Sequence, residues 1–378
     1  MKFSLSEDQQ MVQDMARDFA KSRIEPIAME FDKSHQFPQK LIKEMGELGL
    51  MGVNIPEEYG GAGFDTVSYS LAVMEIAKGC SSFAVTMSVN HLVCEIIRLY
   101  GSEENKKKYL VPLASGDHLG AFCLTEPQAG SDAQNQKTTA KLDGDDYILN
   151  GKKAFITNGT YSDVFIVTAV TSAKDAPKKE ISAFLVEKDA EGLILGQPEH
   201  KMGQCASNTI EVTLENVRVP VSNMLAGTNG FKVMMNGLNS GRIGIASLCC
   251  GLASSALDEA LSYAKDRQAF GKPLNRLPVI QDKIAEMGTL LEASKLMTLN
   301  AAYVKDSGSN YVKSASMAKY FAAENCLKIV DQALQIHGGN GYISEYKIEK
   351  LYRDARITSI YEGTSEIQKI VIARQMTK

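Results

Sequence analysis

The chain has 378 residues, enough for two or three domains with a sizeable hydrophobic core. Its 41 basic and 45 acidic residues nearly balance, and no region is basic enough to indicate a nucleic-acid-binding protein. The N-terminus lacks the apolar segment of a signal peptide, no run of 18 apolar residues is present, and the seven cysteines form no CxxC pair. We therefore expect a cytoplasmic protein, neither secreted nor inserted in a membrane.

The first third of the chain is patterned as helices. Ser6 and Gln9 form a capping-box pair, after which Met11, Met15 and Phe19 recur at helical spacing. The pattern continues, with one break at IPEEYGGAG, to about residue 118. We predict an N-terminal helical domain over residues 1–118.

Short β-rich runs follow, separated by Gly, Asp and Asn turns: GAFCLT, YILNGKKAFIT, DVFIVTAV, ISAFLV and TIEVTL. They predict a middle β domain over residues 119–228. From about residue 230 the helical period returns, and a third long helix is predicted over about 311–336. Two apolar stripes mark the helices before it: Ile245, Leu248, Leu252, Ala256 and Ala260, then Ile280, Ile284, Met287 and Leu291. The fold class is therefore mainly α with a central β domain, ending in a helical bundle over residues 229–378.

Two segments are candidate ligand-binding turns. The glycines of QIHGGNGYISEYKIEKLYRD, at a helix end, form either a C-cap or a backbone that lets amides approach a phosphate. In CLTEPQAGSD a strand runs into a turn of small and hydroxyl residues, which by itself is typical of an ordinary loop. There is no P-loop and no GxGxxG motif, and the five histidines show no metal-ligand spacing.

The segment IYEGTSEIQKIVIAR places Glu362 between a tyrosine and a glycine, just before Thr364 opens a final helix. A structural interpretation is available, because a carboxylate is favoured near a helix N-terminus and threonine is a good N-cap. A carboxylate in a tight, partly apolar turn is also a candidate general base.

Together these segments resemble the acyl-CoA dehydrogenase family over essentially the whole chain. CLTEPQAGSD is similar to the family's first signature, the run from Gln335 to Asp354 is similar to its second, and DRQAFGKPL and YEGTSEIQ are also characteristic. SVN, GRIGIAS and FITNG most resemble the short-chain, butyryl-CoA dehydrogenase branch. The resemblance implies an N-terminal helical domain, a middle β-barrel and a C-terminal four-helix bundle, in a bacterial cytoplasmic homotetramer.

The resemblance also implies a flavoprotein that binds FAD without a Rossmann fold, across subunit interfaces. Thr157 would hydrogen-bond close to the flavin N5, and Arg267 and Phe270 would serve a neighbouring subunit. The residues implied for FAD are Phe122, Leu124, Thr125, Gly130, Ser131, Phe155, Ile156, Thr157, Arg267, Phe270, Gln335, Gly338, Gly339, Thr364 and Glu366.

Glu362 matches the family's catalytic base, which removes the α-proton of an acyl-CoA thioester while the β-hydride passes to flavin N5, giving a trans-2-enoyl-CoA. A dry pocket would raise its pKa toward the working pH, and its backbone amide would stabilise the thioester oxygen. Some relatives carry the base at the position of Gly241, which cannot serve here. The residues implied for the substrate are Ser131, Asn239, Arg242, Tyr361 and Gly363. Alternatives stay open for two of them: a turn hydroxyl for Ser131 and an exposed helix cation for Arg242.

Four positions depart from the family pattern. Asn135 stands where the first signature normally ends in a small residue, and Phe155 replaces a tryptophan that many relatives stack on the flavin. Asn239 occupies a position where relatives often have aspartate, and Pro278 one where many have glutamine. None of these changes touches the proton or hydride step.

The favoured function is a butyryl-CoA dehydrogenase that passes electrons to an electron-transferring flavoprotein. One alternative is the same site working as a crotonyl- or acryloyl-CoA reductase. Another, of a different class, is a non-catalytic flavin- or CoA-binding scaffold, which would have no need of Glu362.

Overall fold

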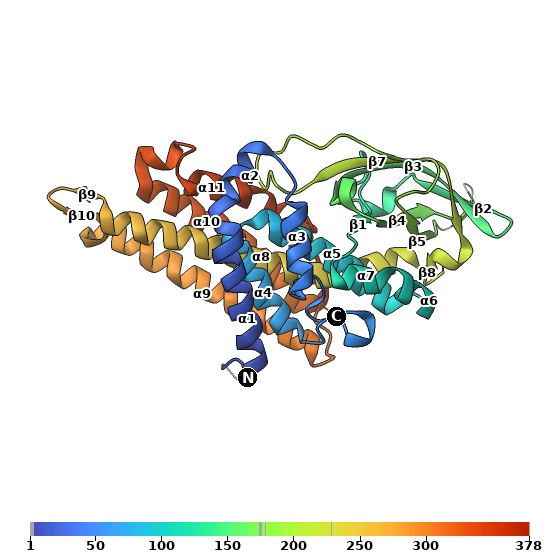
Figure 1. Cartoon of the computed structure of the whole chain (residues 1–378), viewed down its shortest axis with the longest axis horizontal. Helices are drawn as coiled ribbons and strands as arrows, with labels where there is room; N and C mark the ends of the chain where they lie inside the picture. The colour runs from blue at the N-terminus through green and yellow to red at the C-terminus, as the bar shows by residue number, and fades with distance from the viewer. Residues whose placement is uncertain (1–3, 174–175, 178, 228, 378) are drawn as a thin grey trace.

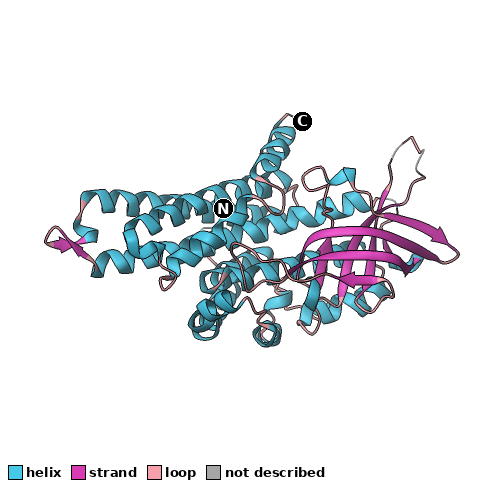
Figure 2. Cartoon of the chain, turned by 90° about the horizontal axis from the view of Figure 1, so that it is seen from above, coloured by secondary structure: helices cyan, strands magenta, loops and turns pink. Residues whose placement is uncertain are grey.

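A computed structural model describes residues 4–173, 176–177, 179–227 and 229–377. Long helices of the C-terminal region form the body of the molecule, the N-terminal helices pack across its middle, and a sheet lies at one end (Figure 1). Turned by 90°, the same arrangement places all the long strands at one end of the helical body (Figure 2).

The N-terminal region is helical, as predicted, and Ser6 and Gln9 form the expected capping box. Its two central helices are almost wholly buried, because α4 and α5 lie between the other N-terminal helices and the C-terminal bundle. The helices are α1 (Glu7–Phe19), α2 (Ala28–Ser34), α3 (Gln39–Glu47), α4 (Thr66–Gly79), α5 (Ser81–Tyr100), α6 (Glu103–Asn105) and α7 (Val111–Ser115).

The middle region is a curved sheet in which two long strands, β3 and β7, pair antiparallel. The hydrogen-bonded order is β6-β7-β3-β2-β4-β5-β8, with β1 parallel to β4. Among the described residues the hydrogen-bonded ladder begins at β6 and ends at β8, and it forms the central β domain that the sequence predicts. The strands are β1 (Gly120–Cys123), β2 (Thr139–Asp143), β3 (Asp146–Thr157), β4 (Val164–Val170), β5 (Ile181–Glu187), β6 (Leu193–Leu195), β7 (Thr209–Pro220) and β8 (Met224–Leu225).

The C-terminal region is built on α8 (Gly230–Asp266), α9 (Pro278–Asp306) and α10 (Val312–His337), and a hairpin of β9 (Gln268–Ala269) and β10 (Lys272–Pro273) caps its far end. The shorter α11 (Lys347–Ala355) and α12 (Ser365–Met376) pack on α10. The stripe predicted on α8 is buried throughout, whereas Ile280 and Ile284 at the start of α9 are half-buried. By length and composition α8 alone among the described helices could cross a membrane, but 78% of its apolar window is buried inside the protein, as in a core helix.

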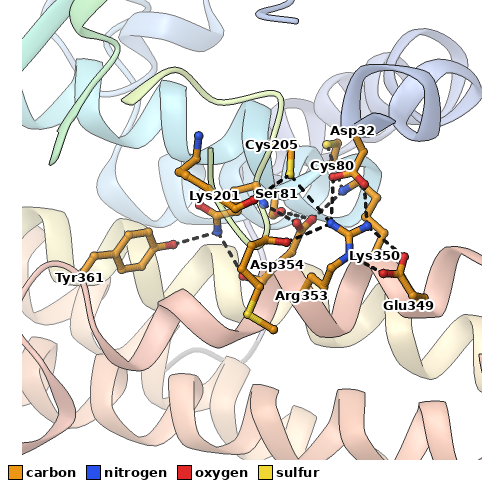
Figure 3. A network of polar contacts seen from close by, with 12 residues as sticks. Asp32, Cys80, Ser81, Lys201, Cys205, Glu349, Lys350, Arg353, Asp354 and Tyr361 are labelled. Atoms are coloured by element: carbon orange, nitrogen blue, oxygen red, sulfur yellow. Dashed lines mark hydrogen bonds and ion pairs between the residues drawn. The ribbon is translucent and has the colours of Figure 1, made fainter. Parts of the chain in front are cut away.

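The three regions meet at the buried carboxylate of Asp354, at the end of α11 (Figure 3). It accepts hydrogen bonds from the Ser81 hydroxyl at 2.7 Å, the Gln204 backbone N–H at 2.5 Å and the Lys350 ammonium at 2.5 Å. Gly203 lets the middle region approach this closely, because a Cβ there would lie 2.4 Å from the Arg353 carbonyl group. Asp354 therefore joins all three regions beside the C-terminal turn that carries Glu362.

Candidate active site

Glu362 lies in the turn that leads into α12, and its backbone is in an unusual conformation. Its φ is 55° and that of Gly363 is 88°, so two successive residues are left-handed. Glycine adopts this conformation freely, but for glutamate it is uncommon and requires support from surrounding contacts. Thr364 then caps α12, accepting a hydrogen bond from the Ile367 N–H at 3.3 Å, as the sequence predicts.

Two buried side chains provide that support by binding the carbonyl groups of the turn. The Gln368 amide donates to the Glu362 carbonyl oxygen at 3.2 Å and to the Gly363 carbonyl oxygen at 2.9 Å. The Lys319 ammonium, from α10, donates to the same Gly363 oxygen at 2.8 Å. The neighbouring Tyr361 hydroxyl accepts from the Gln204 amide at 3.2 Å, which connects the turn to the Asp354 junction (Figure 3).

The carboxyl group of Glu362 points into the protein, and its Oε2 is buried without a hydrogen-bond partner among the described residues. It lies against α8 at Gly241, where an added Cβ would be 2.7 Å from Oε2. Burial raises the pKa of Glu362 to about 7, and the positive charges of Arg242 and Lys319 limit that rise. A carboxyl group with this pKa and a free oxygen is suited to exchanging a proton near neutral pH.

Arg242 is buried in α8, which excludes the interpretation as an exposed helix cation. Its Nη1 donates to the Asn239 side-chain oxygen at 2.7 Å and to the Ser316 hydroxyl at 3.2 Å. Its Nε has no partner in the described part of the chain. Asn239 and Arg242 are therefore brought together beside the Glu362 turn, with the buried Nε of the guanidinium still unpartnered in the described chain.

Residues of α4 and α5 form the wall behind the carboxyl group. A Cβ at Gly241 would lie 2.8 Å from the Leu92 side chain, and one at Gly244 would lie 2.7 Å from the Tyr69 hydroxyl and 3.2 Å from that of Ser88. The two glycines therefore keep the facing surface of α8 free of side chains at the places where the N-terminal helices come closest.

The residues that the resemblance implies for the flavin ring gather at adjacent strand ends of the sheet. The Ala154 N–H donates to the Thr125 carbonyl oxygen at 2.9 Å, and the buried Lys153 ammonium donates to the Leu124 carbonyl oxygen at 3.3 Å. A register shift between β3 and β7 at this point accompanies a φ of 58° at Phe155, whose side chain is 69% exposed. Of the other residues in this group, Phe122 and Thr157 are half-buried, Ile156 is buried, and Gly130 and Ser131 are exposed.

A second group of implied FAD residues lies at the opposite end of the molecule (Figure 1). Arg267 immediately precedes the β9–β10 hairpin and Phe270 lies at its tip, 91% exposed. Gln335, Gly338 and Gly339 lie at the end of α10, and a Cβ at either glycine would meet open space. The described chain does not bring this group together with the sheet residues.

Thr364 and Glu366 form a third group, at the N-terminus of α12. They line a pocket of about 280 Å³ whose other walls include Arg356 and Ser359.

Several residues of this site were not among those that the sequence singled out. They are Lys319 and Gln368, which hold the turn, Gln204, which binds Tyr361, and the wall residues Leu92 and Tyr69. Ser88, the third wall residue, lies in the SVN run that carries the short-chain resemblance.

Models of the three domains of one family match the chain in order: "Acyl-CoA dehydrogenase, N-terminal domain" over residues 6–117, "middle domain" over 121–217 and "C-terminal domain" over 228–377. The chain belongs to the acyl-CoA dehydrogenase family. Acyl-CoA dehydrogenases are FAD-dependent oxidoreductases, so this chain is a flavoprotein enzyme.

Three relatives place this acyl-CoA dehydrogenase more closely. A 3-(aryl)acrylate reductase of Clostridium sporogenes (strain ATCC 15579) is 47% identical over 99% of both chains. The structure of butyryl-CoA dehydrogenase from Megasphaera elsdenii is 40% identical, covers all of both chains and superimposes with a TM-score of 0.98. A chain in the structure of the electron-transferring flavoprotein of Acidaminococcus fermentans, solved in work on flavin-based electron bifurcation, is 44% identical with the same coverage and TM-score.

Proposed function

We propose that this acyl-CoA dehydrogenase converts a short-chain acyl-CoA, butyryl-CoA in the first place, to the trans-2-enoyl-CoA, with Glu362 as the base that removes the α-proton. The observation that carries the proposal is the Glu362 carboxyl group, whose Oε2 is buried and unpartnered within the described chain and whose pKa is raised to about 7. The likeness to the Megasphaera elsdenii butyryl-CoA dehydrogenase supports the short chain length.

The proposed chemistry depends on where the turn places its polar groups. An α-proton of a thioester is weakly acidic, so its removal needs a base with a pKa near the working pH and a donor to the carbonyl oxygen on which charge develops. Glu362 would supply the base, and its backbone N–H would supply the donor. Arg242 and Asn239, with Tyr361, Gly363 and Ser131, would orient the thioester and its CoA arm.

Features of the chain fit FAD. Backbone beside Gly130, Gly338 and Gly339 is open to a ligand, because a Cβ at each glycine would meet no other atom within 4 Å. Phe155 and Phe270 present exposed aromatic surfaces of the kind that a flavin or adenine ring covers. When bound, FAD supplies the acceptor for the β-hydride. The three groups of residues described above would hold it, and Thr157 would donate or accept a hydrogen bond near the flavin N5.

The two main FAD groups lie at opposite ends of one protomer, which supports a homo-oligomer in which the hairpin of one subunit serves its neighbour. We propose a homotetramer in a bacterial cytoplasm. An electron-transferring flavoprotein is the proposed acceptor of the electrons, in line with the Acidaminococcus fermentans likeness.

The reverse reaction is the second candidate, and the 47% identity to a 3-(aryl)acrylate reductase favours it. In that direction Glu362 would return a proton to the α-carbon of an enoyl thioester. The same residues carry both directions, so the electron partner decides between them.

The test is an anaerobic visible spectrum of the holoenzyme titrated with butyryl-CoA, octanoyl-CoA and isovaleryl-CoA. Loss of the flavin absorbance at stoichiometric butyryl-CoA supports the proposal, whereas loss only with octanoyl- or isovaleryl-CoA overturns the short-chain assignment. Titration of the dithionite-reduced enzyme with crotonyl-CoA and 3-phenylacrylyl-CoA tests which enoyl-CoA the reverse reaction would take. Preferential reoxidation by the aryl compound would favour a substrate like that of the 3-(aryl)acrylate reductase.

The matched variant is Glu362→Gln, which keeps the size of the side chain and removes the base. It should bind FAD normally and lose turnover by about 10³-fold or more. Unchanged turnover in this variant would overturn the role of Glu362.

A further inference from the structure

Lys319 is a buried cation whose surroundings are unusual. Its side chain is fully buried in α10, and its Nζ donates one hydrogen bond within the described chain, to the Gly363 carbonyl oxygen at 2.8 Å. A buried ammonium normally binds a carboxylate directly, because burial of an unpaired charge is costly. Here the ammonium binds the backbone of the Glu362 turn instead, and the Glu362 carboxyl charge is among those that act on it.

Gln368 provides an internal comparison for this contact. Its amide donates to the same Gly363 oxygen at 2.9 Å and also to the Glu362 carbonyl oxygen at 3.2 Å. Both side chains therefore hold the left-handed turn, but only Lys319 brings a positive charge to it.

We propose, on the basis that Glu362 is the base, that Lys319 is a positioning residue of the active site with two effects. Its ammonium fixes the Gly363 carbonyl group, and with it the turn that presents Glu362 to the substrate. Its positive charge stabilises the ionised form of the Glu362 carboxyl group, so that the base is available near neutral pH.

The charges that face Glu362 come from several elements. Arg242 on α8 and Lys319 on α10 both lower its pKa, against the effect of burial, which raises it. The other titratable neighbours are Tyr361 in the turn and Tyr69 on α4, whose pKa values burial raises strongly, so both hydroxyls stay neutral.

The charge of Lys319 is present over the range in which Glu362 ionises. Burial lowers the pKa of Lys319 to about 8, while Cys249 on α8, Glu362 and Glu324 on its own helix raise it and Arg242 lowers it. Glu362 ionises near pH 7, below that value, so the ammonium is mostly protonated while the carboxyl group loses its proton.

The experiment compares Lys319→Met with Gln368→Met in the holoenzyme. Lys319→Met removes a hydrogen bond and a charge, whereas Gln368→Met removes hydrogen bonds alone.

The base must be ionised to act, so kcat/KM decreases when the pH falls below the pKa of Glu362. In Lys319→Met we expect the acidic limb of the kcat/KM profile to lie about one pH unit higher than in the wild type. At a pH below both limbs, kcat/KM of the variant should therefore be about tenfold lower than that of the wild type. Gln368→Met should lower the rate without moving the limb, and Lys319→Arg should restore its position.

An acidic limb that stays in place in Lys319→Met overturns the electrostatic role. An equal shift in Gln368→Met overturns it as well, because loss of the turn geometry would then be sufficient. If the wild type turns over none of the acyl-CoA compounds, the proposed function fails. This outcome is seen in the wild type itself, so it can be told apart from a failure of the Lys319 inference.

A second measurement needs no turnover. For the wild type and for Lys319→Met, we measure the melting temperature against pH with and without the additional change Glu362→Gln. The difference between the two melting curves reports the titration of Glu362 alone. In the Lys319→Met background this titration should lie at higher pH than in the wild type, and an unmoved titration overturns the inference. If Lys319→Met does not fold, Lys319→Gln, which keeps a donor and removes the charge, takes its place.

Discussion

At the scale of single residues, Glu362 is held in a state that costs stability. Its carboxyl oxygen is buried without a partner in the described chain, and its backbone is left-handed. Strain and burial of this kind persist where the surrounding structure enforces them, and they concentrate at functional sites. Lys319, Gln368 and the close packing at Gly241 provide that enforcement here.

The first prediction concerns the stability of Glu362→Gln against pH. The pKa of Glu362 is raised from 4.5 to about 7, so the folded state binds its proton more tightly than the unfolded state does. The stability that comes from the protonated form is fully present below pH 4.5 and is lost as pH rises through about 7. Glutamine has no such loss. The variant should therefore gain stability relative to the wild type over that range, by at most about 3 kcal/mol, measured by urea unfolding. A difference that is constant with pH would contradict the raised pKa.

A second prediction at this scale concerns Gly241→Ala. The added methyl group would lie 2.7 Å from the Glu362 carboxyl oxygen and 2.8 Å from Leu92, so we expect it to displace the base. Turnover should fall by about 10²-fold with FAD content unchanged, since small displacements of a base are costly. Gly288→Ala on α9, where the added Cβ meets no atom within 4 Å, is the matched control and should leave kcat unchanged.

At the scale of elements, the contact of α8 with α4 depends on glycine. A Cβ at Gly251 would lie 2.1 Å from the Met74 carbonyl oxygen, a backbone atom that cannot move aside alone. Gly251→Ala should therefore destabilise the protein by about 1–3 kcal/mol, seen as a lower urea midpoint with an unchanged slope. Gly288→Ala serves again as the control. An unchanged midpoint in Gly251→Ala would show that the two helices can separate without cost.

The helices and the order of the three regions can be predicted from the sequence, because periodicity and capping are local signals. Ser6 with Gln9, Thr364 and the apolar stripe of α8 are all confirmed. The burial of Lys319 could also be predicted, because the residue falls at helical spacing among Ala315, Ala322 and Cys326, on the buried face of α10.

What sequence could not provide is the shape of the Glu362 turn. The left-handed backbone is set by Lys319 and Gln368, whose contact with it depends on tertiary packing. The sequence also could not predict that Ile280 is only half-buried, since its burial depends on how far the neighbouring helices extend along α9. The domain boundaries at 118/119 and 228/229 and the roles of individual FAD residues stay predictions.

At the scale of the whole molecule, the distance between the sheet and the β9–β10 hairpin leads to a complementation experiment (Figure 1). Arg267→Ala should weaken FAD binding at a neighbour's site, and Glu362→Gln inactivates a subunit's own site. Each variant alone should be nearly inactive. Subunits of the two variants, mixed by co-expression, should recover activity, because a chain with intact Glu362 then receives Arg267 from its partner. Activity that stays at the level of the separate variants would mean that the hairpin serves its own chain.

Asp354 has a consequence for how the molecule comes apart. One buried carboxylate accepts hydrogen bonds from Ser81 in the N-terminal region, Gln204 in the middle region and Lys350 in its own helix. Departure of the N-terminal or the middle region would remove one of these hydrogen bonds and open the buried ion pair between Asp354 and Lys350 to water. Unfolding is therefore expected as one cooperative transition, with no separately melting sheet. A ligand bound at the sheet alone should slow amide hydrogen exchange in α5 and α11 as well, the helices that carry Ser81 and Asp354.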